Sequence, residues 1–128
     1  MHTYPLIGLK HQECAIIGGT FYPDTANAPT YGTCGHRGWS VAYTSTGLFT
    51  VTLDDKVPGI LVVNQPTLQL ATGADLILQL GTISLSAKTI QIRVWDISGA
   101  AVADIAADAN NAIHWSAIVT QSTIGTGA

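Results

Sequence analysis

Apolar and polar residues alternate along most of the chain between Gly47 and Val119. A period of two places every second side chain on the same face, which is the pattern of a half-buried β-strand. The alternation and the turn residues between its segments predict seven or eight strands, because the two segments on either side of Pro66 can be pieces of one bent strand. These strands cover Glu13–Ile17, Gly38–Tyr43, Phe49–Leu53, Ile60–Asn64, Thr67–Ala71, Leu76–Leu85, Ile90–Trp95 and Ile113–Val119.

The connections between these segments are too short for crossover helices, so neighbouring strands are expected to be antiparallel. Strands of this number around one core form two packed sheets. We therefore predict an all-β fold, an antiparallel β-sandwich of the jelly-roll or Greek-key type. A closed up-and-down barrel is the alternative.

Two connections carry specific expectations. Pro66 separates two apolar pieces, and because proline cannot donate a ladder hydrogen bond, it indicates an edge strand or a bulge. The Ala- and Asp-rich segment Ser98–Asn111 fits either an extended crossover or a short helix. The spacing of three between Val102 and Ile105 slightly favours one helical turn.

The first 37 residues differ from the remainder. They contain three of the five prolines and several glycines, which weaken strands. We assign 1–37 to an irregular N-terminal arm and loops, and 38–128 to the β-sandwich, with both parts in one domain. The small residues at 125–128 are expected to be loosely held.

Charge is scarce in this chain. Asp, Glu, Lys and Arg make up 10% of the residues, where about 25% is usual for a soluble domain. Strand surfaces covered by Thr, Ser, Gln and Asn are poorly protected against sticking. We therefore expect a homo-oligomer, a dimer or a trimer, rather than a free monomer.

The same numbers exclude several classes of partner. The chain has five Lys and Arg residues and a net charge of −3, so it lacks the basic surface that nucleic-acid binding requires. Its apolar runs, such as 59–63, are far shorter than the ~20 residues of a membrane span. The N-terminus has no cationic region before an apolar core, so no cleaved signal peptide is expected.

The candidate chemistry is weak. His11, Cys14, Cys34 and His36 could in principle form a zinc site, but their spacing matches no recognised finger, and ordinary thiols and surface histidines are the favoured interpretation. The aspartates lie at expected turns, where their side chains cap backbone groups; they are Asp54, Asp55, Asp75, Asp96, Asp104 and Asp108. A calcium loop at Asp104 and Asp108 lacks enough oxygen ligands. His114, within the last strand, is interpreted as a packed or interface residue. We expect no catalytic residues, no metal and no cofactor.

Aromatic and aliphatic residues of the first segment are the candidates for partner binding. They are Tyr4, Leu6, Ile7, Phe21, Tyr22 and Tyr31. Trp95 joins them because the aliphatic residues of its strand share one face, which directs Trp95 to the other face with Gln91 and Arg93. Burial of Trp95 under the 98–111 connection is the competing interpretation.

The second half of the chain, from about Gly47 to Thr120, resembles a group of small structural proteins of tailed bacteriophages. The likeness rests on the strand and turn pattern of the segments 47–54, 68–70, 75–81, 90–94 and 106–115. The similar proteins are virion components with jelly-roll folds, and many are capsid decoration ("cement") proteins that bridge capsomers. The first 37 residues lie outside this resemblance.

The resemblance implies a non-enzymatic protein on the outer surface of the capsid, assembled in the host cytoplasm, that stabilises the major capsid protein. The N-terminal arm would bury its aromatic residues on a neighbouring subunit. The alternative is a tail-tip or fibre module that binds carbohydrate. That alternative predicts a pocket with an aromatic floor and an acidic rim at one end of the sandwich.

Overall fold

Antiparallel strands dominate the computed structural model, which describes residues 14–23, 29–32, 37–54 and 59–120 and contains no helix within them. The strands are β1 (Cys14–Tyr22), β2 (Thr30–Tyr31), β3 (Trp39–Ser45), β4 (Leu48–Leu53), β5 (Gly59–Val63), β6 (Thr67–Gln69), β7 (Leu76–Ser84), β8 (Thr89–Asp96), β9 (Ala101–Val102) and β10 (Ala112–Thr120). They confirm the expected all-β class.

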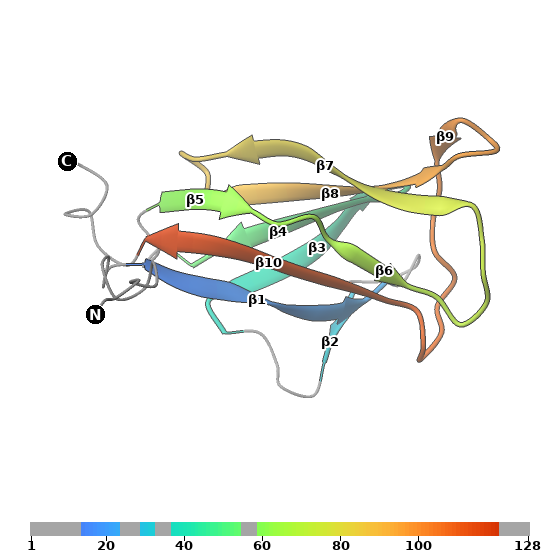
Figure 1. Cartoon of the computed structure of the whole chain (residues 1–128), viewed down its shortest axis with the longest axis horizontal. Helices are drawn as coiled ribbons and strands as arrows, with labels where there is room; N and C mark the ends of the chain where they lie inside the picture. The colour runs from blue at the N-terminus through green and yellow to red at the C-terminus, as the bar shows by residue number, and fades with distance from the viewer. Residues whose placement is uncertain (1–13, 24–28, 33–36, 55–58, 121–128) are drawn as a thin grey trace, which may run out of the picture.

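The strands form two sheets that face each other (Figure 1). The first sheet has the order β2-β1-β10-β5, with β6 also paired to β10. The second has the order β3-β4-β8-β7, with β9 also paired to β8. The two separate sheets make the fold a sandwich, as predicted, and not the closed barrel that was the alternative.

Two of the pairings between distant segments are nested. β1 pairs with β10, and within the chain that they enclose, β4 pairs with β8. An up-and-down arrangement would instead pair each strand with its neighbours in sequence. The nested order is that of a long antiparallel hairpin wrapped into a sandwich, as in a jelly roll.

The proline-separated strands β5 and β6 lie on an edge, as the sequence indicates. Both pair with β10, at opposite ends of that strand, with buried Pro66 between them. The register between β10 and β5 shifts between Ile118 and Val119, where Leu61 is the extra residue, so β5 contains a bulge. One bent edge strand therefore follows the whole length of β10.

The inward faces of the two sheets form a single core. On β8 the alternation is complete, because Ile90, Ile92 and Val94 are all fully buried. On β10, Ile113, Trp115, Ala117 and Val119 face the same interior. The core also includes Phe21, Trp39, Val41, Phe49, Val51, Leu53, Leu78 and Ile105.

Two expectations for individual segments are wrong. The connection 98–111 contains no helical turn: it forms β9, whose Val102 pairs with Trp95, and then runs on as an irregular chain to the buried side chain of Ile105. The first strand is also longer than expected, because β1 extends to Tyr22 and lies between β2 and β10. The described part of 1–37 is thus built into the sandwich. The described residues include no helix long and apolar enough to cross a membrane.

Candidate functional site

The structure places the expected partner-binding residues in different environments. Tyr4, Leu6 and Ile7 lie outside the described residues. Phe21 is fully buried and packs against Phe49, with ring centroids 5.3 Å apart. Phe21 therefore belongs to the core, and assigning it to a partner-binding arm was wrong. It alternates into the interior with Ile17 and Gly19 of the same strand.

Tyr31 lies mostly within the fold. Its hydroxyl oxygen accepts a hydrogen bond from the backbone N–H of Val41, at 3.1 Å. Its ring stands edge-on to Trp39, with centroids 5.4 Å apart. These contacts hold Tyr31 in one position and leave it half-buried.

Trp95 lies on the outer face of its sheet with Gln91 and Arg93, as expected from the alternation on β8. Its cross-strand partners are Ile77 on one side and Val102 on the other. Both partners are exposed, by 39% and 40%, whereas Trp95 is half-buried. The connection that carries Val102 thus lies beside Trp95 and does not cover it completely. Ile77, Trp95 and Val102 form an apolar row at the surface.

Tyr22 and Tyr31 both line a groove of about 480 Å³ at the end of the sandwich where β1 finishes and β10 begins. We call this the end groove. Its other lining residues are Pro23, Thr30 and the loop residues 107–109. Asp108 stands exposed on this loop, so the groove combines tyrosines with an acidic group.

The loop beside the end groove is fixed by Asn111, a buried polar residue. The Asn111 amide donates to the carbonyl of Ala106 at 2.9 Å, and its side-chain oxygen accepts from the N–H of Ala71 at 2.8 Å. The Asn111 backbone N–H donates to the Asp108 carbonyl at 3.1 Å. These bonds hold the loop against the sandwich.

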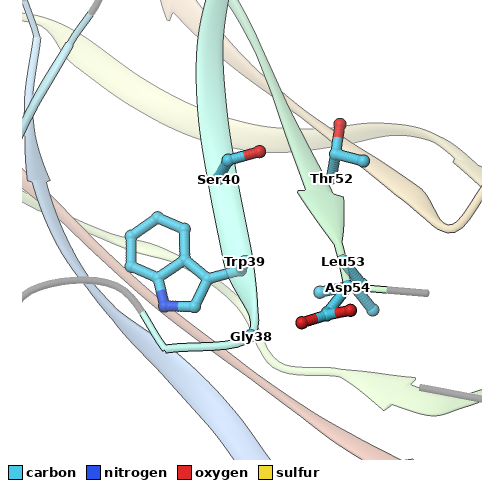
Figure 2. A pocket seen from close by; sticks show the side chains of 6 residues that line it. All are labelled: Gly38, Trp39, Ser40, Thr52, Leu53 and Asp54. Atoms are coloured by element: carbon cyan, nitrogen blue, oxygen red, sulfur yellow. The ribbon is translucent and has the colours of Figure 1, made fainter. Parts of the chain in front are cut away.

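A second depression, of about 300 Å³, lies where β3 begins and β4 ends. Figure 2 shows the hydroxyls of Ser40 and Thr52 on neighbouring strands, with Asp54 beyond the end of β4. Of the described residues, those that line it offer one carboxylate and two hydroxyls, without a histidine or cysteine among them. Such a set can form hydrogen bonds, but it does not pair a nucleophile with a base.

His114 points outward from β10, on the face opposite to buried Trp115. One ring nitrogen lies 2.7 Å from the hydroxyl of Thr20, and the other lies 2.9 Å from the side-chain oxygen of Gln69. Both ring nitrogens are engaged by neighbouring strands. His114 therefore links β10 to β1 and β6 through its side chain, which agrees with its interpretation as a packed or interface residue.

Three of the residues weighed as zinc ligands, His11, Cys34 and His36, lie outside the described residues. Cys14 is half-buried at the start of β1 and has a free thiol. Within the described ranges, no group of three or more His, Cys, Asp or Glu side chains is arranged to hold a metal ion.

Three of the aspartates have hydrogen bonds that show their roles: two are local caps and one makes a long-range contact. Asp96 accepts from the N–H groups of Ser98 and Gly99, and Asp108 accepts from the N–H of Asn110, as expected for turn residues. Asp104 instead reaches the β3–β4 hairpin. Its carboxylate accepts from the Tyr43 hydroxyl, at 2.8 and 3.0 Å, and from the N–H of Gly47, at 2.8 Å.

The contact with Asp104 changes the chemistry of Tyr43. A hydrogen bond to a carboxylate favours the neutral phenol, and it raises the pKa of Tyr43 above the ordinary value of 10.0, with partial desolvation as a smaller cause. Asp104 and Asp108 also bind separate backbone segments, so they do not converge on one ion. The two carboxylates therefore do not form the calcium loop that was considered from the sequence.

Two surface features had no clear signal in the sequence. The end groove joins residues 22–23 and 30–31 to residues 107–109, which are distant in the chain. The other feature is the outer face of the sheet β2-β1-β10-β5, which we call the neutral face. Its outward positions are Cys14, Ile16, Gly18, Thr20, Tyr22, Thr30, Gly59, Val62, Thr67, Gln69, His114, Ser116 and Ile118. Ala112 and Thr120 continue the same alternation at the two ends of β10, but both are buried. The low charge content was the only hint of this face.

Comparison of the chain with protein-family models, with curated proteins and with solved structures found no match.

Proposed function

We propose that this protein is a non-enzymatic structural component that assembles with copies of itself on a larger protein shell. The specific role that we infer is capsid decoration: the protein would sit on the outer surface of a bacteriophage head and bridge major capsid protein subunits. The single observation that carries the proposal is the neutral face, which holds no Asp, Glu, Lys or Arg at any of its described positions.

A charge-free face supports assembly for a physical reason. Proteins keep the outer faces of their sheets apart by placing charges on them, and the cores of protein interfaces are depleted in charge. When identical faces meet about a two-fold axis, a charge near the axis would meet its own copy, and such like-charge contacts oppose self-association. The neutral face carries none of this repulsion.

The neutral face also carries apolar groups that a partner could cover. Ile16, Ile118 and Val62 are cross-strand partners and form one row across β1, β10 and β5. Ile16 is 77% exposed and Val62 is 46% exposed. Leu61, next to Val62, is exposed by 54%. Large exposed aliphatic groups that gather in one place are typical of interaction surfaces.

Size measurement in solution tests the self-association step. We expect the full-length protein to be a dimer or trimer by light scattering, and Ile16→Lys or Val62→Lys to shift it towards the monomer without loss of fold. The matched control is Thr52→Lys, which places the same charge on an exposed position of the other sheet. A monomeric wild-type protein at high concentration, or equal disruption by Thr52→Lys, would contradict the proposal.

The location of the protein tests the decoration step. Many copies on the heads of purified particles would support it, whereas a few copies at the tail would support the alternative of a host-recognition module. Deleting residues 1–12 provides a second test, because the described strands begin only at Cys14. We expect the truncated protein to keep its fold and lose shell binding; unchanged binding would contradict a role for Tyr4, Leu6 and Ile7.

A further inference from the structure

We propose that the end groove, which shares Tyr22 and Thr30 with one end of the neutral face, is a binding site for a neutral carbohydrate. The groove has a volume of about 480 Å³, within the range of roughly 300–1,000 Å³ that small-molecule sites occupy. It is formed by parts of the chain that the fold brings together, and hydrogen bonds hold both sides in place. Tyr31 is bonded to Val41 on one side, and Asn111 is bonded to Ala106 of the loop on the other.

The lining supplies apolar surface first. Tyr22 is half-buried and makes no ring contact with another described aromatic residue. Pro23, Ala107 and Ala109 add hydrocarbon beside it, and Tyr31 is held by its bond to Val41. The ring of a sugar presents C–H groups on its faces, and aromatic side chains offer a large surface for such groups while keeping a polar tip.

The same lining supplies unused hydrogen-bonding groups. The hydroxyls of Tyr22 and Thr30 take part in no hydrogen bond with other described residues. Asp108 uses one carboxylate oxygen, Oδ1, to accept from the N–H of Asn110 and leaves Oδ2 available. A sugar carries many hydroxyls that donate and accept, so it matches two hydroxyls and a carboxylate next to hydrocarbon.

The negative charge of Asp108 disfavours anionic and purely apolar ligands. Among the described residues, the lining includes Asp108 and no Lys, Arg or His, so a phosphate or carboxylate ligand would meet a negative charge there. A purely apolar ligand would cover Asp108 and leave its carboxylate unpaired. A cationic ligand is the serious competitor, because tyrosine rings and a carboxylate also bind quaternary ammonium groups.

Nuclear magnetic resonance on the intact protein tests the proposal. The probes are glucose, galactose, N-acetylglucosamine, maltose and cellobiose, each titrated to tens of millimolar, with choline as the cationic comparison. We expect at least one sugar to shift the backbone amides of Tyr22, Thr30 and residues 107–109, with the amides of the β7–β8 turn unchanged. The absence of shifts with every sugar, or shifts with choline alone, would overturn the proposal.

Variants connect the shifts to the groove. Tyr22→Ala should weaken sugar binding by at least about tenfold, as expected for a central aromatic contact. Ala107→Trp should block the groove without removing a hydrogen-bonding group, and it serves if Tyr22→Ala fails to fold. Asp108→Asn should weaken sugar binding only a few-fold, because an amide still accepts and donates. Leu85→Ala, at an exposed site outside the lining, is the control.

Sugar binding by the four variants either supports or overturns the proposal. Loss of sugar binding in Tyr22→Ala and Ala107→Trp, with binding retained in Asp108→Asn and Leu85→Ala, supports a carbohydrate site at the end groove. Binding that survives Ala107→Trp, or that disappears in Asp108→Asn as a cation would require, overturns it.

Discussion

Trp39 stands edge-on to Trp115, with ring centroids 5.1 Å apart and the ring planes at 83°. The two side chains come from opposite sheets, β3 and β10, so their contact joins the layers of the sandwich. The space for this contact exists because Gly19, the β1 partner of Trp115, has no side chain. A Cβ atom at Gly19 would lie 2.9 Å from the ring of Trp39.

Gly19→Ala should therefore destabilise the protein. A rigid indole between two sheets cannot easily move away from the added methyl group, and overpacking of a core typically costs about 1–3 kcal/mol. Chemical denaturation should show this decrease in the free energy of unfolding. Gly73→Ala is the control, because a Cβ there meets nothing within 4 Å. Equal stability of Gly19→Ala and the wild-type protein would show that Trp39 repacks freely.

The hydrogen bond from Tyr43 to Asp104 gives a pH-dependent prediction. Because the pKa of Tyr43 in the folded protein is raised above 10.0, the bond contributes stability that is fully present below that pH and is lost as the pH rises through the raised value. A titration followed by the ring carbon resonances of labelled tyrosine should show Tyr43 ionising above pH 10.0. Asp104→Asn should lower its midpoint, since the carboxylate is the main cause of the shift. A midpoint that Asp104→Asn leaves unchanged would contradict this assignment.

The local pattern of the sequence was enough to predict most of the strands. On β8, strict alternation predicted which face is inward, and Ile90, Ile92 and Val94 are fully buried. The bend at Pro66 was also predictable, because the missing N–H of proline restricts where it can occur in a sheet. Features of this kind depend on neighbouring residues alone.

Features that depend on distant pairing were not predictable. Val102 and Ile105 have a spacing that suits one helical turn, but pairing of Val102 with Trp95 makes that segment extended. Phe21 was taken for a loop residue because glycines precede it and a proline follows. Those glycines instead allow close packing: a Cβ on Gly18 would lie 2.3 Å from the Trp115 carbonyl oxygen. The end groove likewise forms only when the fold brings residues 22–23 and 30–31 next to residues 107–109.

Asn111→Ala should loosen the loop that borders the end groove. The Asn111 side chain bonds to the N–H of Ala71 and the carbonyl of Ala106, and its loss should cost about 1 kcal/mol of stability. Amide hydrogen exchange should become faster at residues 106–109 and at Ala71. Asn110→Ala, one residue earlier and exposed, is the matched control and should leave exchange there unchanged. Unaltered exchange in Asn111→Ala would mean that the loop is held by other contacts.

Gln65 covers an exposed sheet edge, and its removal should promote aggregation. The strand β7 ends its sheet, and the carbonyl of Leu78 accepts a hydrogen bond from the Gln65 side-chain amide at 2.9 Å. Without this donor, the carbonyl is open to pairing with another chain, beside the exposed side chains of Ile77 and Ile83. Gln65→Ala should therefore aggregate faster on mild heating, as followed by light scattering, at nearly unchanged stability. Thr82→Ala, at an exposed position on the same strand, should aggregate at the wild-type rate. If the two variants aggregate equally fast, Gln65 does not protect this edge.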